Sequence, residues 1–310
     1  MTKKQDKEQM LKCGMVSIIG RPNVGKSTLL NQLVGAKVAI VSNVPQTTRN
    51  QIRGIYTDER GQIIFIDTPG IHAVRDRLDD FMNKSVDFSA EGADCVIHLV
   101  DTMDRVGEDE ERLVKRLAVL KCPIILGLNK VDMNAKHLSE YIKLWESVQG
   151  RPATEFKDFT ILPLSAKTGI HMEELYEAIF QYLPEGPMLY PEDALTDMPK
   201  KMAISDIIRE KFYYILKEEL PHSIAVVVES LRAVRGKTFR IEAVVYVERD
   251  SQKKIIVGHQ GSTVKRAGAM AREDLEELLG QQVFLDLHVK VQKGWRDNDT
   301  MLLEMGYDFL

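Results

Sequence analysis

Cysteine and long apolar runs are scarce in this chain, and each scarcity excludes a class of protein. The three cysteines, Cys13, Cys95 and Cys122, form no CxxC pair and have no metal-ligand spacing. They are expected to be free thiols in a reducing compartment, which argues against a disulfide scaffold or a cysteine zinc site. No apolar run approaches the roughly 20 residues that cross a bilayer. The charged first residues, MTKKQDKEQMLK, also lack the apolar segment of a secretory signal.

A strong net charge is missing as well, since the 310 residues carry only −4 at pH 7. An apolar content of 44% and a charged content of 28% are typical of a folded protein, and the length is sufficient for two domains. The charge is unevenly distributed, however. Residues 232–272 hold 10 Lys/Arg and 3 Asp/Glu. This local basic excess indicates that the C-terminal part has a polyanionic partner.

The sequence shows no internal repeat and no low-complexity segment. Its first half alternates helical segments with short, nearly continuous apolar runs, namely MVSIIG, IIFIDTPG, CVIHLVD, CPIILGLNKVD and FTILPLSAKTG. Strands that are apolar on both faces are typical of a parallel sheet covered by helices. Most of the runs end in a polar or glycine cluster, and ligands of such folds bind at the carboxyl ends of the strands. We therefore predict an α/β domain over residues 1–183.

The chain changes character after residue 183. A proline-rich segment, residues 184–199, is predicted to be a linker. Residues 200–310 then contain a helical stretch, two alternating runs in a hairpin-like arrangement, two helical segments and a strand-like run, QVFLDLHVKV. The order is α-β-β-α-α-β, which predicts a second, α+β domain. No heptad pattern or unpaired apolar stripe is apparent, and we expect a monomer.

The stretch GRPNVGKST fits the pattern G-x-x-x-x-G-K-[ST] between a predicted strand and a predicted helix. Its glycines allow main-chain N–H groups to surround phosphate oxygens, and the helix N-terminus adds partial positive charge. Lys26 would reach the β- and γ-phosphates, and the Ser27 hydroxyl would bind Mg²⁺. All nine residues are predicted to contact the nucleotide: Gly20, Arg21, Pro22, Asn23, Val24, Gly25, Lys26, Ser27 and Thr28.

Three further clusters follow predicted strands. In DTPG, Asp67 can hold Mg²⁺ through water and Gly70 can donate its N–H to the γ-phosphate. In NKVD, the Asp132 carboxylate can accept hydrogen bonds from guanine N1–H and N2–H₂, which adenine does not offer, so GTP is favoured over ATP. In SAK, a main-chain N–H can reach guanine O6. The predicted nucleotide contacts in these clusters are Asp67, Thr68, Pro69, Gly70, Asn129, Lys130, Asp132, Ser165, Ala166 and Lys167.

These four clusters, in this order at strand ends, resemble the translation-factor class of P-loop GTPases. The resemblance implies that Lys26, Asp67 and Gly70 take part in catalysis, together with a threonine of VPQTTRNQ, residues 44–51, that completes the Mg²⁺ shell. Thr47 and Thr48 both qualify for this position. Thr48 is favoured because related GTPases have the threonine directly before an arginine. The predicted Mg²⁺ ligands are then Ser27, Thr48 and Asp67.

The glutamine that orients water in Ras-like enzymes is absent. Gly70 is followed by Ile71 and then by His72, which we expect to be an exposed loop residue. We therefore predict slow intrinsic hydrolysis. Asn23 leads to a second hypothesis, because the pattern GxxNVGKS matches the loop of GTPases that use a monovalent cation. An Asn oxygen beside the phosphates could bind K⁺.

A second glycine pair occurs in IIVGHQGSTVKRAG, residues 255–268. A G-x-x-G tetrad between two helices after a hairpin is the arrangement of a KH domain, here in the type II order, which binds single-stranded nucleic acid. Glycines allow the sugar-phosphate backbone to approach closely, and the basic residues add favourable charge. The predicted RNA contacts are Lys253, Lys254, Gly258, His259, Gln260, Gly261, Lys265 and Arg266.

Together with VKVQKGWRDN, residues 289–298, these motifs resemble the Era family of bacterial GTPases over nearly the whole chain. The resemblance implies binding to the 3′ end of 16S rRNA, a role in small-subunit assembly, and peripheral association with the inner face of the cell membrane in a cytoplasmic protein. The alternative is a membrane-associated signalling GTPase whose C-terminal domain docks protein or lipid. A phosphohydrolase without a switch role is a third possibility.

Overall fold

A computed structural model of the chain describes residues 11–42, 44, 47–71, 74–234 and 238–307. By their contacts, the residues form two compact units. The first comprises Met1–Val38, Gln51–Thr68 and Val86–Asp197, and the second comprises Ala39–Asn50, Pro69–Ser85 and Met198–Leu310. The sequence-based division at residues 183 and 199 follows chain order and stays a prediction.

The first unit is built on a six-stranded sheet in the order β2-β3-β1-β4-β5-β6. All neighbouring strands are parallel except β2, which pairs antiparallel with β3 at one edge. This confirms the predicted mostly parallel α/β fold. The strands are β1 (Lys12–Ile19), β2 (Ile52–Asp58), β3 (Gly61–Asp67), β4 (Cys95–Asp101), β5 (Ile124–Asn129) and β6 (Phe159–Pro163).

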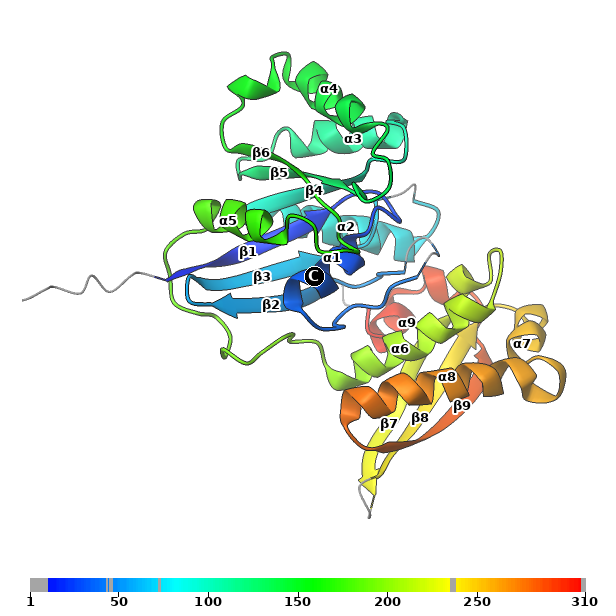
Figure 1. The fold of residues 1–310 in the computed structure, drawn as a ribbon. Coiled ribbons are helices and arrows are strands. Elements are labelled where there is room, and N and C mark those ends of the chain that lie inside the picture. Colours follow the sequence, from blue (N-terminus) through cyan, green and yellow to red (C-terminus); the bar gives the residue numbers. More distant parts are fainter. Residues whose placement is uncertain (1–10, 43, 45–46, 72–73, 235–237, 308–310) are drawn as a thin grey trace, which may run out of the picture. The chain divides into compact units, whose positions relative to one another are not determined.

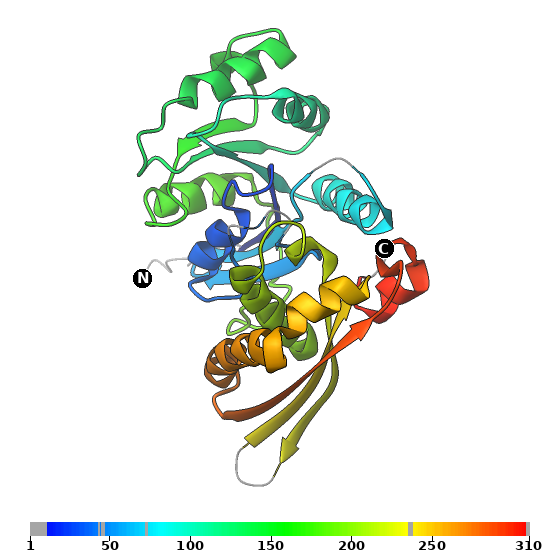
Figure 2. The same cartoon turned by 90° about the vertical axis from the view of Figure 1, so that its right-hand side faces the viewer.

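Helices lie on both faces of this sheet, which explains why its central strands are apolar throughout. Every residue of β3, β4 and β5 is buried. In Figures 1 and 2, α1 and α5 cover one face, and α3 and α4 lie on the other. The helices are α1 (Lys26–Val34), α2 (Arg77–Glu91), α3 (Glu108–Leu117), α4 (Leu138–Gln149) and α5 (Met172–Tyr182).

The proline-rich segment is attached to the first unit by main-chain hydrogen bonds. The N–H of Cys13 donates to the carbonyl of Pro184 at 3.0 Å, and the N–H of Ile55 donates to that of Leu195 at 2.9 Å. The side-chain oxygen of Gln62 accepts from the N–H groups of Leu189 and Tyr190, each at 2.9 Å. Residues of the segment are therefore hydrogen-bonded to strands of the first unit.

The second unit contains a three-stranded sheet in the order β7-β8-β9, with β7 and β8 antiparallel and β8 and β9 parallel. Its described elements are α6 (Lys200–Ile215), β7 (Ala225–Val234), β8 (Thr238–Val247), α7 (Asp250–Val257), α8 (Ser262–Leu279), β9 (Gln282–Val291) and α9 (Asp299–Glu304). The α-β-β-α-α-β order predicted from the sequence is confirmed.

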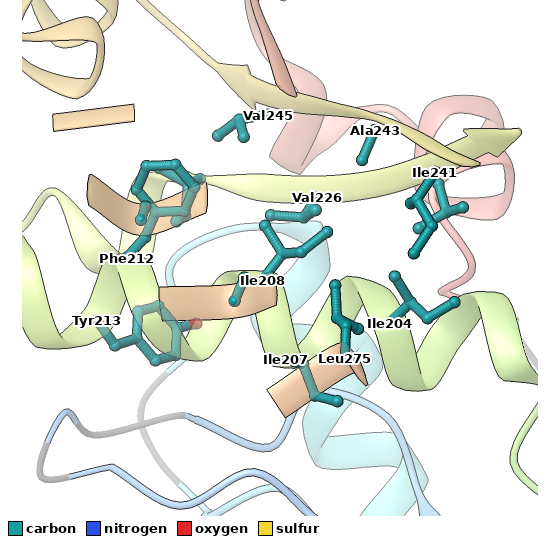
Figure 3. Packing of buried hydrophobic residues seen from close by; sticks show 14 of the residues in the cluster. Ile204, Ile207, Ile208, Phe212, Tyr213, Val226, Ile241, Ala243, Val245 and Leu275 are labelled. Carbon is teal, nitrogen blue, oxygen red and sulfur yellow. The ribbon is translucent and has the colours of Figure 1, made fainter. Parts of the chain in front are cut away.

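The core of this unit forms where α6 and α8 meet the sheet. Ile204, Ile208 and Phe212 recur every four residues along α6 and are fully buried. This spacing places them on one stripe of the helix, and in Figure 3 they lie in one row beside residues of the strands such as Val226 and Ile241. The described residues include no helix that is both long and apolar enough to cross a membrane.

Two segments follow elements of the first unit along the chain but belong to the second unit by their contacts. They are Ala39–Asn50, which follows α1, and Pro69–Ser85, which follows the DT pair of DTPG. The second includes the first half of α2, whose Leu78, Phe81 and Met82 share an apolar cluster with Trp295 and Tyr307. Segments that adjoin the predicted nucleotide motifs are therefore in the same unit as the sheet β7-β8-β9.

Candidate functional site

The phosphate loop lies between β1 and α1, where the sequence predicted it. Gly25 adopts φ +103°, and a Cβ added there would lie 2.6 Å from Asn129 Nδ2. A Cβ at Gly20 would lie 2.3 Å from the carbonyl oxygen of Leu99. Both glycines are therefore required by close approach of neighbouring groups, and Gly25 also by its left-handed backbone. The loop geometry depends on strands β4 and β5 as well as on its own residues.

Lys26 is buried and its ammonium group lies inside the loop. Nζ donates to the carbonyls of Gly20 at 3.0 Å and Arg21 at 2.9 Å. Burial lowers the pKa of Lys26 to about 8, although the negative charges of Asp67 and Glu110 oppose this shift. The Lys26 ammonium group thus has neutral carbonyls as hydrogen-bond partners. An anion bound inside the loop would favour the charged form of Lys26.

The proposed magnesium ligands Ser27 and Asp67 are adjacent. Ser27 Oγ donates to Asp67 Oδ2 at 2.6 Å, and Asp67 is fully buried at the end of β3. The next residue, Thr68, donates its hydroxyl to the carbonyl of Ile18 at 2.9 Å, which fixes β3 against β1. A hydroxyl and a carboxylate that converge at a helix N-terminus are hard oxygen donors of the kind Mg²⁺ prefers. The residues present fit this ion.

Asn129 joins the phosphate loop to the SAK segment. Its Nδ2 donates to the carbonyl of Val24 at 2.7 Å, and its Oδ1 accepts from the N–H of Ala166 at 2.9 Å. Lys130 has φ +66° and donates to the carbonyl of Asn23 at 3.3 Å and to the Asp101 carboxylate.

The remaining residues predicted to contact the base lie on the loops that Asn129 connects. Ser165 is buried, and its hydroxyl accepts from the N–H of Thr168 at 3.2 Å. Asp132 and Lys167 are exposed, so their polar ends are accessible to a ligand. Asn129 therefore joins three of the four predicted clusters into one hydrogen-bonded framework within the first unit, and the Ser27–Asp67 bond attaches the start of the fourth.

The two candidate threonines of VPQTTRNQ lie in the second unit. Thr47 and Thr48 are buried, and the hydroxyl of Thr47 donates to the carbonyl of Val44 at 2.6 Å. The carbonyl of Thr47 accepts from Arg209 at 3.1 Å. The assignment of Thr48 as a magnesium ligand stays a prediction. His72 lies outside the described residues.

Arg49 is a functional candidate that sequence reasoning missed. It is only 2% exposed, and its guanidinium donates to the main-chain carbonyls of Ile224 at 2.7 Å and His222 at 3.0 Å and to the Tyr307 hydroxyl at 3.2 Å. It also lies over the ring of Trp295. The available sequence signal was an arginine directly after two threonines. The hydrogen-bond acceptors of its guanidinium are 170 residues or more away in sequence, and no local pattern indicates them.

The second glycine pair lies between α7 and α8 as predicted. Gly258 and Gly261 have φ +74° and +78°, and Gln260 between them has φ +51°. A Cβ at Gly258 would lie 2.3 Å from Thr263 Oγ1, whereas one at Gly261 would meet nothing closer than 3.6 Å. The first glycine is required by close packing, whereas a Cβ at the second would make only ordinary van der Waals contacts.

Basic side chains surround this turn. Lys254, Lys265, Arg266, His259 and Gln260 are exposed, and Lys253 is half-buried. Helix α8 begins at Ser262, directly after the tetrad, so its N-terminal N–H groups add partial positive charge. The turn, the helix end and the basic residues together form a surface suited to a phosphate backbone.

Comparison with known proteins agrees with this arrangement. Residues 15–130 match the family described as 50S ribosome-binding GTPase, and residues 219–296 match the KH domain family. The GTPase Era of Carboxydothermus hydrogenoformans is 46% identical over 297 residues, which cover 96% of this chain and 98% of that protein. The chain belongs to the Era family of GTPases. The Era of Halothermothrix orenii is 43% identical over the same share of both chains.

Two solved Era structures resemble this chain over most of its length. Aquifex aeolicus Era, crystallised as a variant bound to GDP and AlF₄⁻, is 36% identical with a TM-score of 0.88, and the match covers 96% of this chain and 99% of that one. A second Era structure, in complex with MgGDPNP and nucleotides 1506–1542 of 16S ribosomal RNA, has a TM-score of 0.89 at the same identity and coverage. Membership of the Era family confirms the predicted GTPase and the predicted C-terminal KH domain.

Proposed function

We propose that this protein is a slowly hydrolysing GTP switch that binds the 3′ end of 16S rRNA and assists assembly of the small ribosomal subunit. The observation that carries the proposal is that one chain holds a complete set of guanine-nucleotide motifs and a basic G-x-x-G turn in the KH arrangement. An Era that shares the fold over 96% of this chain was solved with a GTP analogue and an rRNA fragment.

In this proposal each nucleotide motif has a defined task. Main-chain groups of residues 20–28 surround the phosphates, and Lys26 pairs with the β- and γ-phosphates in place of its present carbonyl partners. Ser27, Thr48 and Asp67 hold Mg²⁺, which neutralises charge on the phosphates when it is bound. Asp132 selects guanine, and Asn129 keeps the loop of Asp132 in register with the phosphate loop. No glutamine follows Gly70, so intrinsic turnover is slow.

Asn23 is proposed to hold K⁺ beside the phosphates. The residue is exposed, and its φ of +63° departs from ordinary backbone. We expect hydrolysis to be faster in K⁺ than in Na⁺ at matched ionic strength, and Asn23→Ala to remove the difference. Steady-state phosphate release measures this. Equal rates of the unmodified protein in the two salts would exclude the cation role.

The nucleotide state is proposed to reach the RNA-binding unit through residues 39–50 and 69–85. Both segments are covalently continuous with nucleotide motifs, yet by contacts they are part of the KH-containing unit. Arg49 fixes the first segment through the carbonyls of Ile224 and His222. A nucleotide that orders these segments therefore acts directly on the unit that holds RNA, and the coupling of the two ligands must be reciprocal.

Arg49→Gln tests this coupling. We expect it to lower the free energy of unfolding by about 3 kcal/mol, because buried carbonyls lose their donor, and to bring the RNA affinities of the GDP and GTP-analogue forms closer together. Chemical denaturation and fluorescence anisotropy measure the two effects. Arg53→Gln is the matched control, since Arg53 is partly exposed and pairs with Asp197 at the surface, where an ion pair contributes at most about 1 kcal/mol. Unchanged coupling in Arg49→Gln would contradict the proposal.

Cellular location and partners are proposed on the family resemblance. We propose a cytoplasmic monomer that binds the small subunit and associates peripherally with the inner face of the cell membrane. Nothing in the described residues favours the alternative of a signalling GTPase that docks protein or lipid. Cosedimentation with isolated small subunits tests the ribosomal role. Binding to small but not large subunits is the expected result, and its absence in every nucleotide state would contradict the assembly role.

A further inference from the structure

A buried polar network extends from the second residue of the phosphate loop into the helices of the first unit. Arg21 Nε lies 2.6 Å from Glu110 Oε2, and Arg21 Nη2 donates to the Tyr141 hydroxyl at 3.2 Å. Glu110 lies on α3 and Tyr141 on α4, and both are fully buried. Two helices from other parts of the chain therefore hold one arginine of the loop.

The remaining partners fix the Glu110 carboxylate in turn. His98 Nε2 lies 2.8 Å from Glu110 Oε1, and Trp145 Nε1 lies 3.1 Å from His98 Nδ1. An indole N–H can only donate, so His98 Nδ1 accepts and the proton is on Nε2, which donates to Glu110. His98 is therefore neutral in this arrangement. The Glu110 charge is left to pair with Arg21.

The main chain of Arg21 forms part of the phosphate site. Its carbonyl accepts from Lys26 Nζ at 2.9 Å, beside the contact of Lys26 with Gly20. A side chain held at two points restricts the rotation of its own peptide groups. The network thus determines where the carbonyls that face Lys26 lie.

We propose that Glu110, oriented by His98, is a positioning residue for nucleotide binding. It holds Arg21 so that the peptide groups of Gly20 and Arg21 keep the geometry that receives phosphates. The inference rests on the nucleotide site proposed above and adds a group that does not touch the nucleotide. Stability alone is a poor reason for such a network, because buried ion pairs are often replaced by apolar residues with little loss of stability.

Nucleotide dissociation kinetics test this role. Glu110→Gln keeps the acceptor for His98 but removes the charge that pairs with Arg21. We expect fluorescent GDP to dissociate roughly tenfold faster, since small displacements of a loop have effects of that size or larger. Trp145→Phe removes the donor to His98 and is expected to shift the rate in the same direction by less. Glu111→Gln, the next residue on α3 and half exposed, is the matched control and should not change the rate.

A further control separates positioning from stability. Ile125→Val lies in the core of β5, is fully buried and has no part in the network. We expect it to lower the melting temperature without changing GDP dissociation. In a double-mutant cycle, Arg21→Gln combined with Glu110→Gln should dissociate GDP no faster than either single variant, because both remove the same interaction.

The outcomes distinguish the two proposals. Tight binding of GDP by the unmodified protein with unchanged kinetics in Glu110→Gln would overturn only the positioning role. Equal acceleration in Ile125→Val would overturn it too, since the effect would then follow stability. Failure of the unmodified protein to bind GDP would overturn the nucleotide site itself.

Discussion

Asp132→Asn lowers the affinity for GTP by roughly a hundredfold or more and gives the protein affinity for XTP. The carboxylate is proposed to accept hydrogen bonds from guanine N1–H and N2–H₂, and each bond to a charged group contributes about 1.5–3 kcal/mol. An asparagine amide would present N–H₂ to those donors. Xanthine has a carbonyl in place of the 2-amino group, so the same amide can donate to it.

The position of Asp132 depends on a buried framework, which makes the prediction specific. Val131, the preceding residue, donates its N–H to the carbonyl of Leu164 at 3.3 Å, and Asn129 bridges to Val24 and Ala166. Titration with fluorescent GTP and XTP analogues measures the exchange of preference. Asp109→Asn, on the exposed surface of α3, is the control and should bind GTP normally. GTP affinity unchanged in Asp132→Asn would refute the assignment of the base site.

Gly258→Asp abolishes measurable binding of single-stranded RNA. The residue has φ +74°, and its Cβ would lie 2.3 Å from Thr263 Oγ1 and 2.8 Å from the Thr263 nitrogen. Any side chain therefore displaces the start of α8, whose N–H groups face the proposed phosphate path. A carboxylate also introduces repulsion in a site where affinity depends on positive charge. We expect the loss to exceed that of Gly261→Asp, where the added Cβ meets nothing within 3.6 Å.

Gly280→Asp is the matched control for backbone strain. Gly280 also has a positive φ, +63°, and ends α8, with nothing within 4 Å of an added Cβ. Helix α8 has 18 residues, which places Gly280 about 27 Å from the tetrad at 1.5 Å per residue. Anisotropy with a labelled RNA should show normal binding by Gly280→Asp. Melting curves identify variants that fail to fold. RNA binding retained by a folded Gly258→Asp would refute the role of the glycine pair.

Much of the fold follows from patterns that are local in sequence. The central strands β1, β3, β4 and β5 are apolar on both faces, and β9 occupies the run QVFLDLHVKV that predicted it. Strand β2 was not predicted because Gly54 interrupts its short apolar pattern. The structure explains that glycine, since an added Cβ would lie 2.6 Å from Leu30 and from Val34 of α1. Gly54 interrupts the apolar pattern of the strand in the sequence, but in the fold it is required because α1 packs closely against it.

The candidate sites divide in the same way. The phosphate loop and the G-x-x-G turn are contiguous motifs, and the sequence located both. Arg49, Glu110 and His98 were missed because their roles depend on partners that only the fold brings near. His98 interrupts an otherwise apolar strand, CVIHLVD, and a polar residue within such a strand was the available signal. No sequence pattern indicates that residues 39–50 and 69–85 belong to the second unit.

Coupling between the nucleotide site and the KH domain would appear as an RNA affinity that depends on nucleotide state. A labelled single-stranded RNA matching the 3′ end of 16S rRNA would be titrated with protein that is free, GDP-loaded or loaded with a non-hydrolysable GTP analogue, at two salt concentrations. We predict that the analogue form binds most tightly and that affinity falls steeply as salt rises, because phosphate contacts release counterions. Equal affinity in all three states would contradict the switch, and no binding at either salt would contradict the RNA-binding role.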